Sequence, residues 1–290
     1  MKDRYPGIGN FRNSVHMMVL ILLQSLVVPY ARPASNHVDD QTCGIPFPTT
    51  TLKKATLIKG WITVDRWGVW HFTTEKKADD SIDAFRVLAC TESLRNVVFP
   101  SEPRAIWIDE TARNLDQLRS LGDLKKLKYL YVHASTVTNS DIKAISELES
   151  LEGLAFEDAS FTNTTFDLLT KAKRLQVLAL NRTGLTNNQL KEIGTLGTLT
   201  SLRIAFPSSE GLNLRSILRL RDLQLLSVSG SVRLEFDLDD PSELPKLRAL
   251  ELSYSNLPKG ILTTLSKLRN LECLSLQGNE LGAISGTNGL

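Results

Sequence analysis

Residues 175–186 read LQVLALNRTGLT, with leucine at the first, fourth and sixth places. The same spacing, apolar–x–x–apolar–x–apolar, returns every 24 residues along the chain. Its first place is leucine in seven units, which begin at Leu127, Leu151, Leu175, Leu199, Leu223, Leu247 and Leu271. One unit upstream also fits, with Pro103, Ile106 and Ile108. Because the fourth and sixth places are apolar in all eight units, the period predicts a repeat architecture.

The spacing of the apolar residues differs between the first and the second half of each unit. The fourth and sixth places lie two residues apart, so they point to the same side of a short strand. The second half has helical spacing, as at Leu190, Ile193 and Leu196, and polar residues before it supply capping side chains. Such a unit cannot bury its apolar face alone, whereas stacked units share one continuous core.

This pattern resembles the leucine-rich repeat, with its consensus Leu-x-x-Leu-x-Leu-x-x-(Asn/Thr/Ser)-x-Leu, and the 24-residue unit is similar to the bacterial version. The match covers residues 103–281. The resemblance implies an α/β solenoid shaped as a horseshoe, with parallel strands on the concave face, helices on the convex face and a small α+β cap at the N-terminal end. In the unit from Leu223, Pro241 and Pro245 stand where a helix should be, so we expect an extended or short 3₁₀ segment there.

The chain divides into three predicted segments: residues 1–34, the cap at 35–102, and about eight repeats at 103–290, the last one incomplete. In the first segment Lys2, Arg4 and Arg12 precede an apolar run at 15–28. This run is shorter than the about 20 residues that a membrane-spanning helix needs. It therefore favours a secretory signal, or a membrane anchor if it is not cleaved. We expect an exported protein in the periplasm, in the cell envelope or outside the cell.

The sequence of the cap predicts two short strands and a helix. Residues 62–72, ITVDRWGVWHF, predict two short strands around a turn, whereas Ile82, Phe85 and Leu88 have helical spacing. In an exported protein Cys43 and Cys90 are a candidate disulfide pair, with unpaired thiols as the alternative. No cap is visible after Leu281, which suggests end-to-end self-association or a chain cut short of its natural end.

Composition and motifs exclude several function classes. Lys plus Arg is 34 and Asp plus Glu is 32, and without a dense basic run this balance argues against nucleic-acid binding. The four histidines show no metal-binding spacing, and hydrolase and phosphate-loop motifs are missing. We therefore predict no catalytic residues, no metal and no cofactor. An acidic cluster at 235–243 favours a solvated loop over a calcium site, because its spacing is not that of an EF-hand.

The side chains between the buried positions of each strand should face the concave side. They give ten predicted partner-binding residues: Trp107, Asp109, Tyr129, Tyr131, His133, Glu157, Asn181, Arg203, Glu251 and Tyr254. Three aromatic rings lie at the N-terminal end of this set, and such rings are favoured interface anchors. The alternative is that they pack on the cap or on each other.

A long curved face of similar rungs predicts a non-catalytic protein–protein interaction module, which is an inference by analogy of fold. The second hypothesis is a glycan-binding or structural protein of the cell envelope, in which the same aromatic patch would stack on sugar rings.

Overall fold

The computed structural model describes residues 56–64, 69–75, 82–88, 99–108, 121, 124–133, 136–161, 164–207, 211–240 and 243–279. The predictions for residues 1–34, for Cys43 and Cys90 and for the end of the chain after Leu281 lie outside these ranges. Within them, no helix is long and apolar enough to cross a membrane.

One large sheet runs through the whole described part of the chain. Its strands are β1 (Thr56–Val64), β2 (Trp70–Thr73), β3 (Ile82–Leu88), β4 (Ala105–Ile108), β5 (Tyr129–His133), β7 (Gly153–Glu157), β9 (Val177–Asn181), β10 (Ser201–Ala205), β12 (Leu225–Ser229), β14 (Ala249–Ser253) and β15 (Cys273–Ser275). From β3 to β15 all neighbours are parallel. Leu178 pairs with Leu154 on one side and Leu202 on the other, so the register advances by 24 residues per strand. This register confirms the predicted repeat.

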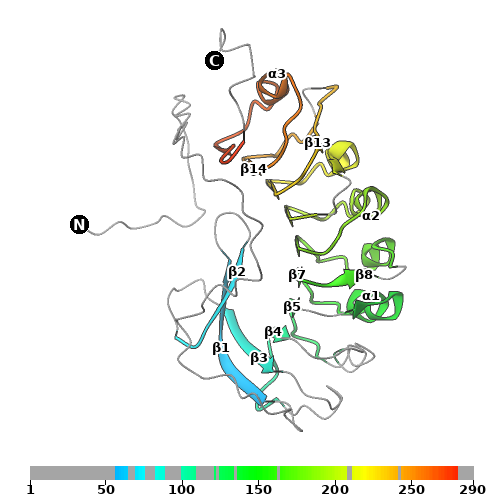
Figure 1. Ribbon diagram of the computed structural model, residues 1–290. Helices are drawn as coiled ribbons and strands as arrows, with labels where there is room; N and C mark the ends of the chain where they lie inside the picture. Colours follow the sequence, from blue (N-terminus) through cyan, green and yellow to red (C-terminus); the bar gives the residue numbers. More distant parts are fainter. Residues whose placement is uncertain are drawn as a thin grey trace, which may run out of the picture.

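Short elements on the outer side close each unit. They are β6 (Thr136–Val137), β8 (Ser160–Phe161), β11 (Leu212–Asn213), β13 (Leu234–Glu235), the helices α1 (Asn139–Ser146), α2 (Asn187–Ile193) and α3 (Ile261–Leu265), and the 3₁₀ helices η3 (Asp167–Lys171) and η4 (Leu214–Arg219). Figure 1 shows these helices on the convex side of an arc whose inner side is the sheet. The arc with its inner sheet and outer helices is the predicted horseshoe.

The main core lies between the sheet and the outer elements. The leucines at the fourth place of the units that begin at Leu127 to Leu247, such as Leu154 and Leu178, are fully buried in it, whereas Leu274 of the last unit is partly buried. Capping boxes start two helices, with Thr138 before α1 and Thr186 before α2. The unit from Leu223 has no helix among its described residues, as its prolines predict.

The cap strands extend the same sheet instead of forming a separate layer. β1 pairs antiparallel with both β2 and β3, which confirms the predicted pair of strands at 62–72. The predicted helix through Ile82, Phe85 and Leu88 is wrong, because these residues form β3, which pairs in parallel with β4. Ala84, Phe85 and Val87 are all buried. Since both faces of β3 are covered, apolar residues stand on both, and their spacing imitates a helix.

The β1–β2 hairpin bends back over the concave face. Figure 1 shows β2 across the hollow of the arc from β5 and β7. A second apolar core fills the space between them, composed of Ile62, Trp70, Ala84, Ala105, Trp107, Tyr131, Ala155 and Ala179, with Phe72, Ile82, Tyr129 and Val177 packed against it. The cap therefore occupies the N-terminal half of the concave side.

Candidate functional site

The predicted aromatic patch lies inside this second core. Trp107 and Tyr131 stack with ring centroids 3.4 Å apart and are only 9% and 5% exposed. Trp70 of β2 meets Tyr129 edge-on at 5.8 Å, and Phe72 approaches Trp107 at 6.0 Å. The expectation that these rings form an open surface is therefore wrong for Trp107 and Tyr131. The sequence predicts the hairpin but not the direction in which it bends, and this direction decides which rings are covered.

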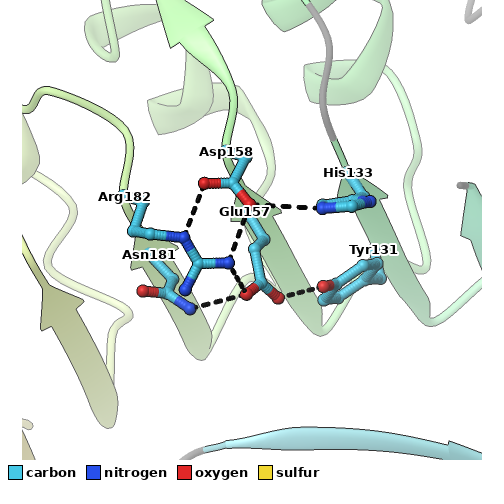
Figure 2. A network of polar contacts seen from close by, with 6 residues as sticks. All are labelled: Tyr131, His133, Glu157, Asp158, Asn181 and Arg182. Atoms are coloured by element: carbon cyan, nitrogen blue, oxygen red, sulfur yellow. Dashed lines mark hydrogen bonds and ion pairs between the residues drawn. The ribbon is translucent and has the colours of Figure 1, made fainter. Parts of the chain in front are cut away.

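A polar network borders the covered patch, as Figure 2 shows. Glu157 of β7 is at its centre and accepts a hydrogen bond from the Tyr131 hydroxyl. On the other side it accepts from Asn181 Nδ2 at 2.8 Å and from Arg182 Nη2 at 2.6 Å. The network thus links the buried rings to the open part of the concave face. Asp109, which was predicted to lie beside these residues, is outside the described ranges.

Asp158 forms the outer part of the network. It accepts from Arg182 Nε at 2.6 Å and lies 3.3 Å from His133 Nε2. Partial burial by itself raises the pKa of Asp158, but the hydrogen bond and charge of Arg182, with those of His133, outweigh it and leave the pKa below its ordinary value. Asp158 and Glu157 in turn raise the pKa of Arg182, chiefly through the hydrogen bond between Arg182 and Asp158. The pair therefore stays charged over the whole physiological pH range.

Replacing Asp158 by asparagine is expected to lower the free energy of unfolding at pH 7 by about 0.2–1 kcal/mol, because the pair is partly exposed. A carboxyl whose pKa is lowered by folding stabilises the protein above its unfolded-state pKa and loses this effect as the pH falls through the folded-state pKa. The difference between wild type and variant should therefore vanish in acid. Urea unfolding at pH 7 and in acid measures it, with the exposed Glu149→Gln as control, and an equal difference at both pH values would contradict the assignment.

Further along the concave face, Arg203, Ser227 and Glu251 form a second polar group on β10, β12 and β14. Arg203 Nη1 donates to Ser227 Oγ at 2.7 Å and to Glu251 Oε2 at 3.2 Å, and Ser227 Oγ donates to Glu251 Oε2 at 2.5 Å. The two charged side chains are 17% and 14% exposed. Because the charges of Arg203 and Glu251 neutralise each other, this group offers a polar surface with no excess charge.

A repeated backbone feature follows each of the strands from β7 to β15. The eighth residue of each unit has a positive φ between 48° and 73°, at Asp158, Arg182, Phe206, Gly230, Tyr254 and Gly278. We call these six residues the rim row. The N–H groups of the first five each donate to a carbonyl of the next unit, as from Phe206 to Ser229. The chain is a leucine-rich-repeat solenoid. In this solenoid the rim row marks the edge of the concave face at the carboxyl ends of the strands.

Aromatic side chains of the rim row are open to solvent. Among the described residues three large apolar side chains are exposed: Phe206 at 44%, Val232 at 58% and Tyr254 at 52%. They belong to three successive units. The Phe206 ring occupies the place that a Cβ of Gly230 would take, and the Tyr254 ring does the same at Gly278. Of these, only Tyr254 was predicted. In the sequence, glycine at residues 230 and 278, two units apart, was the signal that could have indicated space for the ring of Phe206.

Nine of the ten predicted residues are described by the structure, and they fall into separate groups in the solenoid. Tyr131, His133, Glu157 and Asn181 share the network of Figure 2. Arg203 and Glu251 are joined in the second polar group, and Tyr254 stands on the rim. Trp107 and Tyr129 belong to the second core. Within the described ranges no three His, Cys, Asp or Glu side chains are placed to hold a metal ion, and Asp239 of the acidic cluster is paired with Arg215.

No protein-family model matches the sequence, and no curated protein matches it. Among solved structures, internalin C2 of Listeria monocytogenes is 19% identical with a TM-score of 0.45, over 67% of this chain and 80% of its own. Another internalin of the same organism is 18% identical with a TM-score of 0.40, over 61% and 55%. The leucine-rich-repeat ectodomain of the Arabidopsis thaliana receptor kinase GASSHO1/SCHENGEN3 is 21% identical with a TM-score of 0.41, over 60% and 23%. The chain thus spans about half of the second internalin and under a quarter of the ectodomain. The assignment to this fold depends on the register within the chain itself.

Proposed function

We propose that the protein is a non-catalytic interaction module that binds a partner protein on the open, C-terminal half of its concave face and on the adjoining rim row. One observation carries the proposal: the exposed large apolar side chains of the described residues, Phe206, Val232 and Tyr254, follow the carboxyl ends of three successive strands, β10, β12 and β14. A gathered apolar patch marks an interaction surface more often than scattered exposed residues do. Aromatic anchors with an arginine nearby, here Arg182, are the residue types that carry most binding energy.

The backbone of the rim row supports this proposal. A left-handed conformation costs a residue other than glycine about 1–3 kcal/mol, and such strain gathers at functional sites. Phe206 and Tyr254 both adopt it and hold their rings out towards solvent. On the inner side of the rim, Arg203 and Glu251 supply polar groups that are held by hydrogen bonds to each other and to Ser227. A preorganised surface of this kind lowers the entropic cost of association.

The glycan hypothesis depended on an open patch of Trp107 and Tyr131. These rings stack on one another beneath β2, so no observation favours sugar over protein. We further propose export, on the apolar run at 15–28 alone. The N-terminal sequence of the mature protein tests it, since a start beyond residue 28 is expected and an intact residue 1 in the cytoplasm would contradict it.

Photo-crosslinking tests the interaction surface. A photoreactive phenylalanine at residue 206 or 254 is expected to form a covalent adduct with another protein, and the same group in place of Lys191, exposed on α2, is expected to form none. With the crosslinked protein purified, Phe206→Ala should weaken its binding at least tenfold, which corresponds to about 1.4 kcal/mol. Equal labelling from residues 191 and 206 would contradict the proposal.

A further inference from the structure

We infer that the rim row binds a polyproline II segment of its partner, a proline-rich peptide with a basic residue one turn ahead of its first anchoring proline. This inference rests on the proposed function and names the chemical class of the partner. It is based on the spacing of the side chains along the rim row and on their charge.

Every second side chain of the rim row forms the contact surface. Asp158 and Phe206 lie two units apart, with Arg182 between them, and Phe206 and Tyr254 lie two units apart, with Gly230 between them. Neighbouring parallel strands lie about 4.8 Å apart, so two units correspond to about 9.6 Å. A polyproline II helix has three residues per turn and rises about 3.1 Å per residue, so one turn is about 9.3 Å long. Successive turns of such a peptide therefore fall on successive members of this set.

Other peptide conformations fit this spacing less well. Side chains on one face of an extended strand repeat at about 6.6 Å or about 13 Å, because each residue adds about 3.3 Å and alternate residues point away. The turns of an α-helix repeat at about 5.4 Å, so four turns cover about 22 Å. The four units between Asp158 and Tyr254 cover only about 19 Å. Two turns of polyproline II cover about 18.6 Å. Proline-rich segments also bind preferentially to aromatic-lined surfaces, since they are already ordered before binding.

Hydrogen-bonding capacity and charge agree with this conformation. The carbonyl groups of a polyproline II helix have no internal partners, so they accept hydrogen bonds from the binding surface. Tyr254 Oη accepts from Gln277 Nε2 at 3.0 Å, which leaves the tyrosine proton to be donated. At the other end, two carboxylates, Glu157 and Asp158, face the one guanidinium of Arg182, and Asp158 also lies 3.3 Å from His133 Nε2. With the His133 imidazole neutral, this end has an excess of one negative charge. A lysine or arginine of the peptide complements that charge.

A defined peptide tests the inference. The probe is fluorescein-labelled KPAPPAPPA, in which prolines follow the lysine after three and six positions, and its binding to the purified full chain is followed by fluorescence anisotropy. Phe206→Ala and Tyr254→Ala are each expected to weaken binding at least tenfold, and Lys191→Ala to leave it unchanged. A peptide with glutamate in place of lysine should bind several-fold more weakly. Urea unfolding of each variant shows that the solenoid is intact.

Each outcome of these measurements supports or overturns the inference. Binding of the probe that depends on both Phe206 and Tyr254 supports it. If a crosslinked partner depends on Phe206 while the probe fails to bind at millimolar concentration, the polyproline inference is overturned and the proposed function stands. Rim-dependent binding of a glucan oligosaccharide in place of the probe also overturns it. If neither the probe nor any protein depends on Phe206, both proposals fail together.

Discussion

Replacing Trp70 by alanine is expected to lower the free energy of unfolding by about 3–5 kcal/mol, the usual loss when a large aromatic residue is removed from a core. Trp70 is 6% exposed and touches both Tyr129 and Tyr131 across the concave side. Without it the hairpin loses its ring contacts with Tyr129 and Tyr131. The fluorescence of Trp107, now shielded by Phe72 and Tyr131, should shift to longer wavelength as water reaches it.

Two further variants separate packing from other effects of this substitution. Trp70→Phe keeps an aromatic ring and removes the indole N–H, for which no hydrogen-bond partner exists among the described residues, so it should cost much less than alanine. Tyr254→Ala removes an exposed ring and should change stability by no more than about 0.5 kcal/mol. A loss at Trp70 no greater than that at Tyr254 would show that the hairpin does not pack on the concave face.

A second large effect is expected at the rim, where Gly230→Ala should destabilise the solenoid by about 2–5 kcal/mol. Gly230 has a φ of 73°, which costs an alanine about 1–2 kcal/mol. In addition the new Cβ would overlap the ring of Phe206, and overpacking of this kind costs about 1–3 kcal/mol. Urea unfolding measures the sum.

Other glycines of the same chain supply matched controls. Gly184 has a φ of 60° with open space around its Cβ position, so Gly184→Ala should show the backbone cost alone. Gly197 has open space and no positive φ, so Gly197→Ala should be neutral or stabilising. Adding Phe206→Ala to Gly230→Ala removes the overlap and should recover part of the loss. If alanine has the same effect at residues 184 and 230, the ring of Phe206 does not lie against Gly230.

Most of the solenoid follows from local sequence patterns. Leucine at every 24th residue places Leu154 and Leu178 in consecutive layers, because identical units minimise their exposed apolar area by stacking in register. Thr186 before α2 and the prolines after Leu223 predict where helices begin and where one is missing. These signals are short-range, so one sequence suffices to interpret them.

The binding surface is less accessible to the same reasoning. The alternation of inward and outward residues along each strand correctly brings Arg203 and Glu251 together on the concave side. It cannot show that Asp158 and Arg182 adopt positive φ, since neither residue type requires this conformation. In the sequence, only the repeated glycine at residues 230 and 278 indicates a positive φ at this place of the unit.

Periodicity alone thus specifies the stacking of units and the side on which each leucine is buried, because every unit repeats the same local preference. Only the tertiary structure decides which part of the concave face is open. The β1–β2 hairpin bends back and places Trp70 against Tyr131, a contact between residues 61 positions apart that no local pattern encodes. Burial of aromatic area favours this contact, and it leaves the rim beside Phe206 and Tyr254 as the accessible surface.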